Sequence, residues 1–148
     1  MTRKEERDFI AVRATSPLTK REVEMYELLK DTFPEYTVLS QVDFKRVVGR
    51  QDIDKQTYMK EVGRLSLDFV ILDRKYKPVA CIELNDTSHD QPRTMYNDEL
   101  KKHYLKSAEI HLLHCRKMPT AEKLKKVISH IEKKRLELGA VSGGRGQV

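Results

Sequence analysis

The chain has 148 residues, the size of one domain with a hydrophobic core of its own. Charged residues make up 35% of it and hydrophobic residues 39%, a balance typical of a globular protein and unlike that of a disordered chain. The longest apolar runs, Phe69–Leu72 and Val79–Ile82, have four residues each, so the sequence predicts no membrane-spanning helix. The net charge of +6 is compatible with a polyanionic partner, although solubility alone explains such a charge in many proteins.

The N-terminal residues and the cysteines favour the cytoplasm. The opening residues MTRKEERDF are charged throughout and contain no apolar stretch, so we expect no signal peptide. Cys81 and Cys115 both lie in apolar segments. That context favours small buried hydrophobic side chains in a reducing compartment over a disulfide framework or a zinc site. We therefore expect a cytoplasmic protein.

The domain boundaries follow from composition. Residues 1–17 are polar and end at Pro17, which predicts a flexible N-terminal arm. The patterned part of the sequence predicts a single domain over residues 18–138. The C-terminal letters SGGRGQV predict a disordered tail, which we place over residues 139–148.

The first predicted elements are a helix and a strand. Thr19 and Glu22 form a capping-box pattern, in which each side chain satisfies a free backbone amide at the start of a helix. Apolar side chains then follow at helical spacing, and Pro34 ends the helix. These apolar residues are Val23, Tyr26, Leu29 and Phe33. The β-branched and aromatic residues at 36–42 predict a strand.

Residues 43–64 form a long basic connection. A connection of this length is usually functional or carries a short helix of its own. Its side chains are candidates for contacts with nucleic-acid phosphates, although a solvated loop explains them equally well. The basic residues are Lys45, Arg46, Arg50, Lys55, Lys60 and Arg64.

Two strands, at residues 65–73 and 78–85, flank a polar turn and predict a hairpin. If the hairpin is symmetric about the middle of this turn, Asp68 pairs with Glu83. The two carboxylates would then lie directly opposite each other, about 5 Å apart at Cβ. Asn85 would lie on the same face, because side chains alternate along a strand.

The rest of the chain completes an α/β pattern. A helix is expected at 93–108, a short buried strand at 110–114 and a final amphipathic helix after the cap Thr120. The inward positions of the last helix are Leu124, Val127, Ile128 and Ile131. The predicted order is helix, three strands, helix, strand, helix (αβββαβα), with a central mixed sheet flanked by helices.

Opposed carboxylates on neighbouring strands favour a metal site. Like charges directly across a sheet are destabilising, and a divalent cation relieves the repulsion. Oxygen ligands at this spacing suit Mg²⁺ or Mn²⁺, which keep several waters and accept substrate phosphate oxygens as further ligands. The alternative is that Asp68 or Glu83 points to solvent or pairs with a lysine or arginine. Spacing alone gives the two explanations equal weight.

A resemblance adds to this pattern. The segments Leu67–Leu72 and Val79–Asp90 resemble the PD-(D/E)XK nuclease superfamily. More narrowly, they are similar to an uncharacterised bacterial family close to the very-short-patch-repair endonucleases, in which Asp-Phe-Val, a hairpin and Ile-Glu-Leu-Asp-Asp-x-Ser-His follow in that order. The resemblance covers about residues 18–116. It extends to Leu18-Thr19-x-x-Glu22, Gln41-Val42, Asp98 with Lys101, and Leu112-Leu113.

The resemblance implies a restriction-endonuclease-like core and Mg²⁺- or Mn²⁺-dependent hydrolysis of DNA phosphodiester bonds. It assigns Asp68 and Glu83 as metal ligands, with the Leu84 carbonyl as a candidate third. The sequence departs from the superfamily at Asn85, where the motif has a lysine that orients the attacking water. Asparagine can coordinate a metal through its carbonyl oxygen but brings no charge and is no base. Either a lysine from elsewhere, Lys101 or Lys102, substitutes for the missing one, or catalysis is weak or absent.

Three further residues are candidates for catalytic roles, each with a structural alternative. Glu22 is either an active-site residue or only a helix cap, and the cap is favoured. Gln41 either binds a metal-bound water or simply ends a strand. His89 either transfers protons near neutral pH or caps the following turn, and the motif favours the first.

Another three residues, His111, His114 and Cys115, are poor zinc candidates. They alternate along a short strand, so they cannot all face one ion. Packing in the core or on the surface is the favoured explanation.

Two hypotheses remain. The first is a metal-dependent endonuclease that acts on DNA. The second is a catalytically inactive nuclease-fold module that binds nucleic acid or a protein partner, which Asn85 favours.

Overall fold

A computed structural model of the protein describes residues 8–49, 54–85 and 92–146. The elements in chain order are α1 (Lys20–Thr32), β1 (Thr37–Asp43), the single 3-10 turn η1 (Phe44–Arg46), α2 (Lys55–Val62), β2 (Ser66–Leu72), β3 (Pro78–Leu84), α3 (Pro92–Ser107), β4 (His111–Cys115) and α4 (Ala121–Gly146). The predicted order of strands and main helices is confirmed. The structure adds η1 and α2 inside the basic connection.

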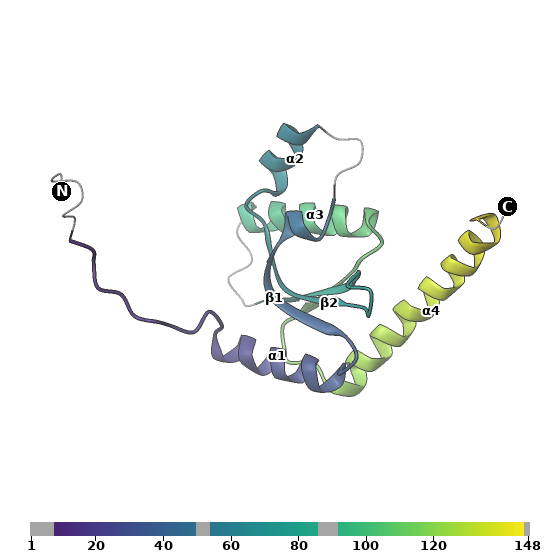
Figure 1. The fold of residues 1–148 in the computed structure, drawn as a ribbon, viewed down its shortest axis with the longest axis horizontal. Helices are drawn as coiled ribbons and strands as arrows, with labels where there is room; N and C mark the ends of the chain where they lie inside the picture. The colour runs from purple at the N-terminus through teal and green to yellow at the C-terminus, as the bar shows by residue number, and fades with distance from the viewer. Residues whose placement is uncertain (1–7, 50–53, 86–91, 147–148) are drawn as a thin grey trace.

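The four strands form one mixed sheet in the order β1-β2-β3-β4. The first three are antiparallel neighbours, and β4 pairs parallel to β3. The parallel pair needs a crossover, which α3 supplies between β3 and β4. Figure 1 shows α1 and α4 on one side of the sheet and α2 and α3 on the other. The chain is thus an α/β protein with a mixed sheet flanked by helices.

Each face of the sheet has its own hydrophobic core. Burial of such side chains contributes about 1.5–3 kcal/mol each and sets which helix face meets the sheet. The core under α1 and α4 includes Met25, Leu29, Phe69, Ile71, Ile82, Leu124, Ile128 and Ile131. The core under α2 and α3 includes Phe44, Tyr58, Val62, Val70, Cys81, Leu105 and Ile110.

The capping box predicted for α1 is confirmed. The Glu22 amide donates to Thr19 Oγ1 at 3.2 Å, and the Thr19 amide donates to Glu22 Oε1 at 2.8 Å. The face that packs on the sheet carries Met25 and Leu29, which are fully buried. Val23, part of the predicted apolar spacing, is 41% exposed. The residues at i and i+4 from Met25 define the inner face, and Val23 lies off it.

The connection between β1 and β2 is folded. Asp54 caps α2, since its Oδ1 accepts from the amides of Gln56 at 2.9 Å and Thr57 at 3.3 Å. Tyr58 and Val62 are buried in the core beneath the helix. Of the two explanations offered for this long connection, the short helix is therefore confirmed.

Helix α4 extends further than the sequence predicted. Thr120 caps it, and Leu124, Ile128 and Ile131 are buried as expected. Its backbone is helical to Gly146, beyond residue 138, where the sequence analysis ended the domain. Adding residues to an existing helix costs little compared with nucleating one, which allows the helix to continue beyond its packed part.

Across the described residues, no helix has both the length and the apolar character that crossing a lipid bilayer requires.

Candidate functional site

The hairpin of β2 and β3 has the register predicted from the sequence. Its pairs include Phe69 with Ile82 and Val70 with Cys81. One further step along this register places Asp68 opposite Glu83. The Leu84 amide also donates to Asp68 Oδ2 at 2.8 Å, which ties the Asp68 carboxylate to the end of β3.

Symmetry about the turn fails close to the turn itself. Leu72 pairs with Pro78, because the register shifts between Ile71 and Leu72. The turn alone would place Asp68 opposite Ile82, and the shift by one residue moves the partner of Asp68 to Glu83.

Lys101 reaches the Glu83 carboxylate from α3. Its Nζ lies 2.9 Å from Glu83 Oε1, and the two side chains are only 14% and 8% exposed. The neighbouring Lys102, named as the alternative, is exposed. Of the two lysines that could replace the missing motif lysine, the structure thus brings Lys101 to Glu83.

Glu83 is the one charged or polar residue among the buried residues that the structure describes. Burial raises its pKa to about 7, Lys101 opposes this rise, and the hydrogen bond and charge of Asp68 add to it. The pKa is raised because the low-dielectric surroundings and the neighbouring carboxylate both disfavour the charged form of Glu83. Perturbed groups of this kind are concentrated at functional sites, although structural ion pairs also produce them.

Asn85 follows β3 and contacts β4 rather than the carboxylates. Its backbone amide donates to the Cys115 carbonyl at 2.9 Å, and its side-chain Nδ2 lies 2.9 Å from His114 Nδ1. His114 is also the β4 residue in register with Glu83. His114 therefore borders the site beside Asn85, a position that the sequence did not indicate.

Arg21 joins the start of α1 to the same edge of the sheet. Its Nη1 donates to the Asn85 carbonyl at 3.3 Å, and its Nη2 donates to the Arg116 carbonyl. These bonds fix the N-terminal end of α1 beside the ends of β3 and β4. The sequence did not indicate Arg21, because no local pattern predicts how α1 docks on strands far along the chain.

Glu22 and Gln41 contact each other. Gln41 Nε2 donates to Glu22 Oε2, and Gln41 has a positive φ of 51°. In the β1–β2 register Gln41 falls at the level of Asp68, between the pairs formed by Ser40 and Val42. The capping role of Glu22 is confirmed. Within the described ranges, no hydrogen bond or ion pair joins Glu22 or Gln41 to Asp68, Glu83 or Lys101.

The structure spreads the basic residues of the connection over several elements. Lys45 and Arg46 lie on η1, Lys55 and Lys60 on α2, and Arg64 just after it, and all five are exposed. Lys60 and Arg64 line a hollow of about 870 Å³ between α2 and α3. Arg50 and His89 lie outside the described residues.

The donor set of the site is made of oxygens. Among the described residues, no three His, Cys, Asp or Glu side chains are grouped so as to hold a metal ion. Asp68 and Glu83 supply two carboxylates, and Mg²⁺ is commonly bound by one or two carboxylates plus waters and phosphate oxygens. Burial raises the pKa of the nearby Cys81 thiol to about 12, so it stays protonated and does not compete as a thiolate ligand.

Fold and site together define an α/β protein with two opposed carboxylates and a lysine at the open end of its central hairpin. A family model described as Protein of unknown function (DUF2726) matches residues 15–134, most of the chain. The chain belongs to this family, and the matched span includes Asp68, Glu83 and Lys101. No curated protein matches the chain. No solved structure matches it.

Proposed function

We propose that the protein is a metal-dependent nuclease with a restriction-endonuclease-like core of the PD-(D/E)XK type, and that it hydrolyses phosphodiester bonds of DNA. The observation that carries the proposal is the placement of Asp68 opposite Glu83, with Lys101 Nζ at 2.9 Å from Glu83. The motif resemblance around this hairpin adds support. We place the protein in the cytoplasm, because Cys81 and Cys115 are buried free thiols.

Asp68 and Glu83 would hold Mg²⁺ or Mn²⁺, with the Leu84 carbonyl as a candidate third ligand. When bound, such a cation activates water and stabilises the negative charge that develops on phosphate. The hydrogen bond from the Leu84 amide to Asp68 Oδ2 fixes one carboxylate before any ligand arrives. A fixed carboxylate pair is preorganised, so little reorganisation is needed during the reaction.

Lys101 takes the place of the motif lysine, whose position on β3 is occupied here by Asn85. Its ammonium group comes from α3 instead of β3 and lies at the Glu83 carboxylate. In this position it can donate hydrogen bonds to the attacking water and stabilise charge on the phosphate. Asn85 keeps a structural task, since it links the ends of β3 and β4 through Cys115 and His114.

The exposed basic residues around η1 and α2 would contact the DNA backbone. Phosphate contacts of this kind make affinity fall as salt rises. Reversing the charges of Lys45, Arg46 and Lys55 together should weaken DNA binding at low salt, measured by fluorescence anisotropy. Reversing Lys75, Lys125 and Lys126 together, all exposed in the hairpin turn and α4, changes the net charge by the same amount and should change little. Equal losses of DNA affinity in the two variants would mean that net charge alone causes the effect.

The direct test is a cleavage assay on supercoiled, linear and single-stranded DNA. Each substrate is incubated with Mg²⁺, Mn²⁺ or a chelator, using wild type and Asp68→Ala side by side. We expect cleavage that requires the cation and is lost in the variant. Cleavage that survives in Asp68→Ala would come from a contaminant or from another site.

A second candidate function rests on Asn85. Without a lysine on β3, the same fold can bind nucleic acid, or a protein partner, without cutting it. Salt-dependent DNA binding by wild type, with no cleavage under any cation, would favour this module. If DNA does not bind even at low salt, a protein partner becomes the better explanation.

A further inference from the structure

A pocket of about 860 Å³ opens where the strands β3 and β4 begin, beside α4. The candidate carboxylate site lies where the same strands end. His111 pairs with Ala80 at the beginning of β4, whereas His114 pairs with Glu83 near its end. The two histidines are three positions apart along β4, so their side chains lie on opposite faces of the sheet. The pocket is therefore distinct from the Asp68–Glu83 site.

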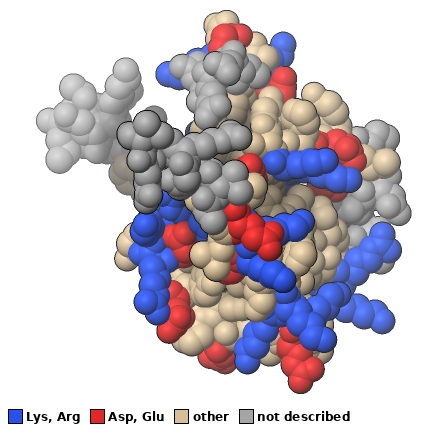
Figure 2. All heavy atoms as spheres, turned by 90° about the vertical axis from the view of Figure 1, so that its right-hand side faces the viewer, with Lys and Arg blue, Asp and Glu red and all other residues tan. Residues whose placement is uncertain are grey.

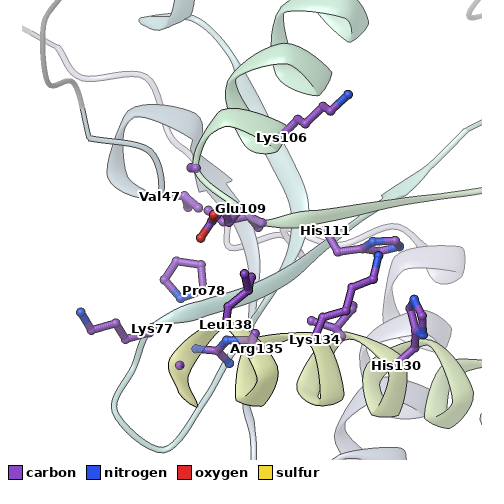
Figure 3. Close-up of a pocket in the computed structure, with 14 residues that line it drawn as sticks. Val47, Lys77, Pro78, Lys106, Glu109, His111, His130, Lys134, Arg135 and Leu138 are labelled. Atoms are coloured by element: carbon purple, nitrogen blue, oxygen red, sulfur yellow. The ribbon is translucent and has the colours of Figure 1, made fainter. Parts of the chain in front are cut away.

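One side of the pocket is lined by three basic side chains from two elements. Figure 3 shows Lys134 of α4 extending toward His111 of β4, with His130 one turn away on α4. The acidic lining residue, Glu109, lies on the other side of the pocket near Val47, and Lys106 points outward. The face from which α4 projects carries many Lys and Arg side chains (Figure 2).

Among the described residues, His111, His130 and Lys134 have no ion pair, whereas Arg135 in the same pocket has two. Arg135 is held by Asp73 at 2.9 Å and by Glu132 at 3.1 Å. For Lys134, by contrast, the structure records no ion pair with any described residue. Burial lowers the pKa of His111, and the charges of His130 and Lys134 lower it further. A charge on His111 is thus disfavoured by its neighbours His130 and Lys134, and an anion bound among the three groups would relieve that conflict.

We propose that His111, His130 and Lys134 form a binding site for a phosphate group. Three N–H donors that converge from β4 and α4 suit a tetrahedral oxyanion, which accepts hydrogen bonds on several sides. The pocket volume leaves room for more than the phosphate itself. The phosphate belongs either to a small phosphorylated molecule or to a nucleic-acid backbone. Neither source depends on the nuclease proposal.

The test measures binding of AMP and of a short DNA duplex at low salt. Wild type is compared with Lys134→Ala and with Lys133→Ala, which removes the same charge from the next residue of α4, outside the pocket. We expect Lys134→Ala alone to weaken binding about tenfold, the effect of losing one charge-assisted hydrogen bond. Weaker binding of AMP alone would identify a small phosphorylated ligand. Weaker binding of the duplex would identify a contact with the nucleic-acid backbone. Equal affinities of the two variants for both probes would overturn the proposal.

A second readout follows the histidines directly. The other titratable groups that line the pocket with His111 are His130, Lys134, Lys77, Lys106, Arg135 and Glu109. Sulfate stays fully charged over the pH range in which histidine titrates, so its binding should raise the pKa of His111 in an NMR titration. Asp68→Ala should give the same rise, which separates this site from the proposed nuclease. An unchanged titration curve at saturating sulfate would count against the site.

Discussion

At the turn of the β2–β3 hairpin, the Asp73 carboxylate accepts hydrogen bonds from two backbone amides and pairs with Arg135 at 2.9 Å. At the open end of the same hairpin, Asp68 faces Glu83, and Lys101 of α3 pairs with Glu83 at 2.9 Å. The first carboxylate is surrounded by donors and its pKa is lowered. At the other end, burial and a like charge raise the pKa of Glu83 to about 7.

The difference separates a structural carboxylate from a candidate functional one. Two amides, a guanidinium and a tight turn satisfy Asp73, so nothing more is needed there. Asp68 and Glu83 together carry more negative charge than Lys101 neutralises, and Glu83 is buried. A buried charge conflict destabilises the fold, and proteins retain such conflicts chiefly where a ligand or a reaction uses them.

The same substitution at both ends gives the largest expected contrast. Asp68→Asn should lower metal-dependent DNA cleavage by about a thousandfold, because it removes part of the several kcal/mol that a bound cation contributes to the transition state. Asp73→Asn changes the same atom and should leave the rate within about twofold. Initial rates of plasmid cleavage at saturating Mn²⁺ measure both. Comparable cleavage rates for the two variants would mean that Asp68 has no catalytic role that Asp73 lacks.

Neighbouring lysines on α3 give the next contrast. Lys101→Ala should slow cleavage about one hundredfold, as expected for one positioned catalytic group. Lys102→Ala removes an exposed charge from the adjacent position and should cleave like wild type. Circular dichroism checks that both variants fold. If Lys101→Ala cleaves as fast as Lys102→Ala, the proposal that Lys101 replaces the motif lysine is wrong.

Metal binding should distinguish the two ends without any catalysis. At a Mn²⁺ concentration about one hundred times Kd, binding to the folded state stabilises it by about 2.7 kcal/mol. We expect wild type and Asp73→Asn to gain several degrees in melting temperature on adding Mn²⁺. Glu83→Gln, which keeps the side-chain size, should gain none. A gain of the same size in Glu83→Gln would place the cation elsewhere.

The hairpin was predictable because its information is local. A short turn joins the two strands, and the register beyond the shift at Ile71 and Leu72 sets Asp68 opposite Glu83. Lys101 was reachable for a similar reason, since α3 follows the hairpin directly and crosses over its face. The remaining contacts depend on long-range docking. Arg21 meets Asn85 only after α1 packs on the sheet, and His114 does so only through the parallel register of β4.

The connection between β1 and β2 shows a second limit of the sequence. Asp54 and the buried Tyr58 and Val62 specify a short helix, but charged residues between them mask its apolar stripe. With only two turns, α2 depends on tertiary packing more than on its own propensity. Sequence periodicity therefore left two explanations open, and contact with the core decides between them.

The smallest expected effect concerns pH at the turn. Burial alone would raise the pKa of Asp73, but the Lys77 amide, the Arg135 guanidinium and the Lys75 amide together hold it below its ordinary value. A carboxyl group with a lowered folded-state pKa contributes stability above its unfolded pKa and loses it as pH falls through the folded value. Asp73→Asn keeps an oxygen acceptor for the turn amides but loses the charge that pairs with Arg135. It should therefore cost about 1 kcal/mol near pH 7.

That cost should vanish in acid. The carboxyl group protonates near pH 4 in the unfolded chain and at lower pH in the folded protein, so the urea midpoints of wild type and Asp73→Asn should converge as pH falls below about 4. The charge of Arg135 persists throughout this range, so the convergence reports the carboxyl group alone. Arg135→Gln is the matching variant, because its cost should disappear over the same interval. A gap between the midpoints that stays constant with pH would mean that the turn geometry, rather than the ion pair, accounts for the contribution of Asp73.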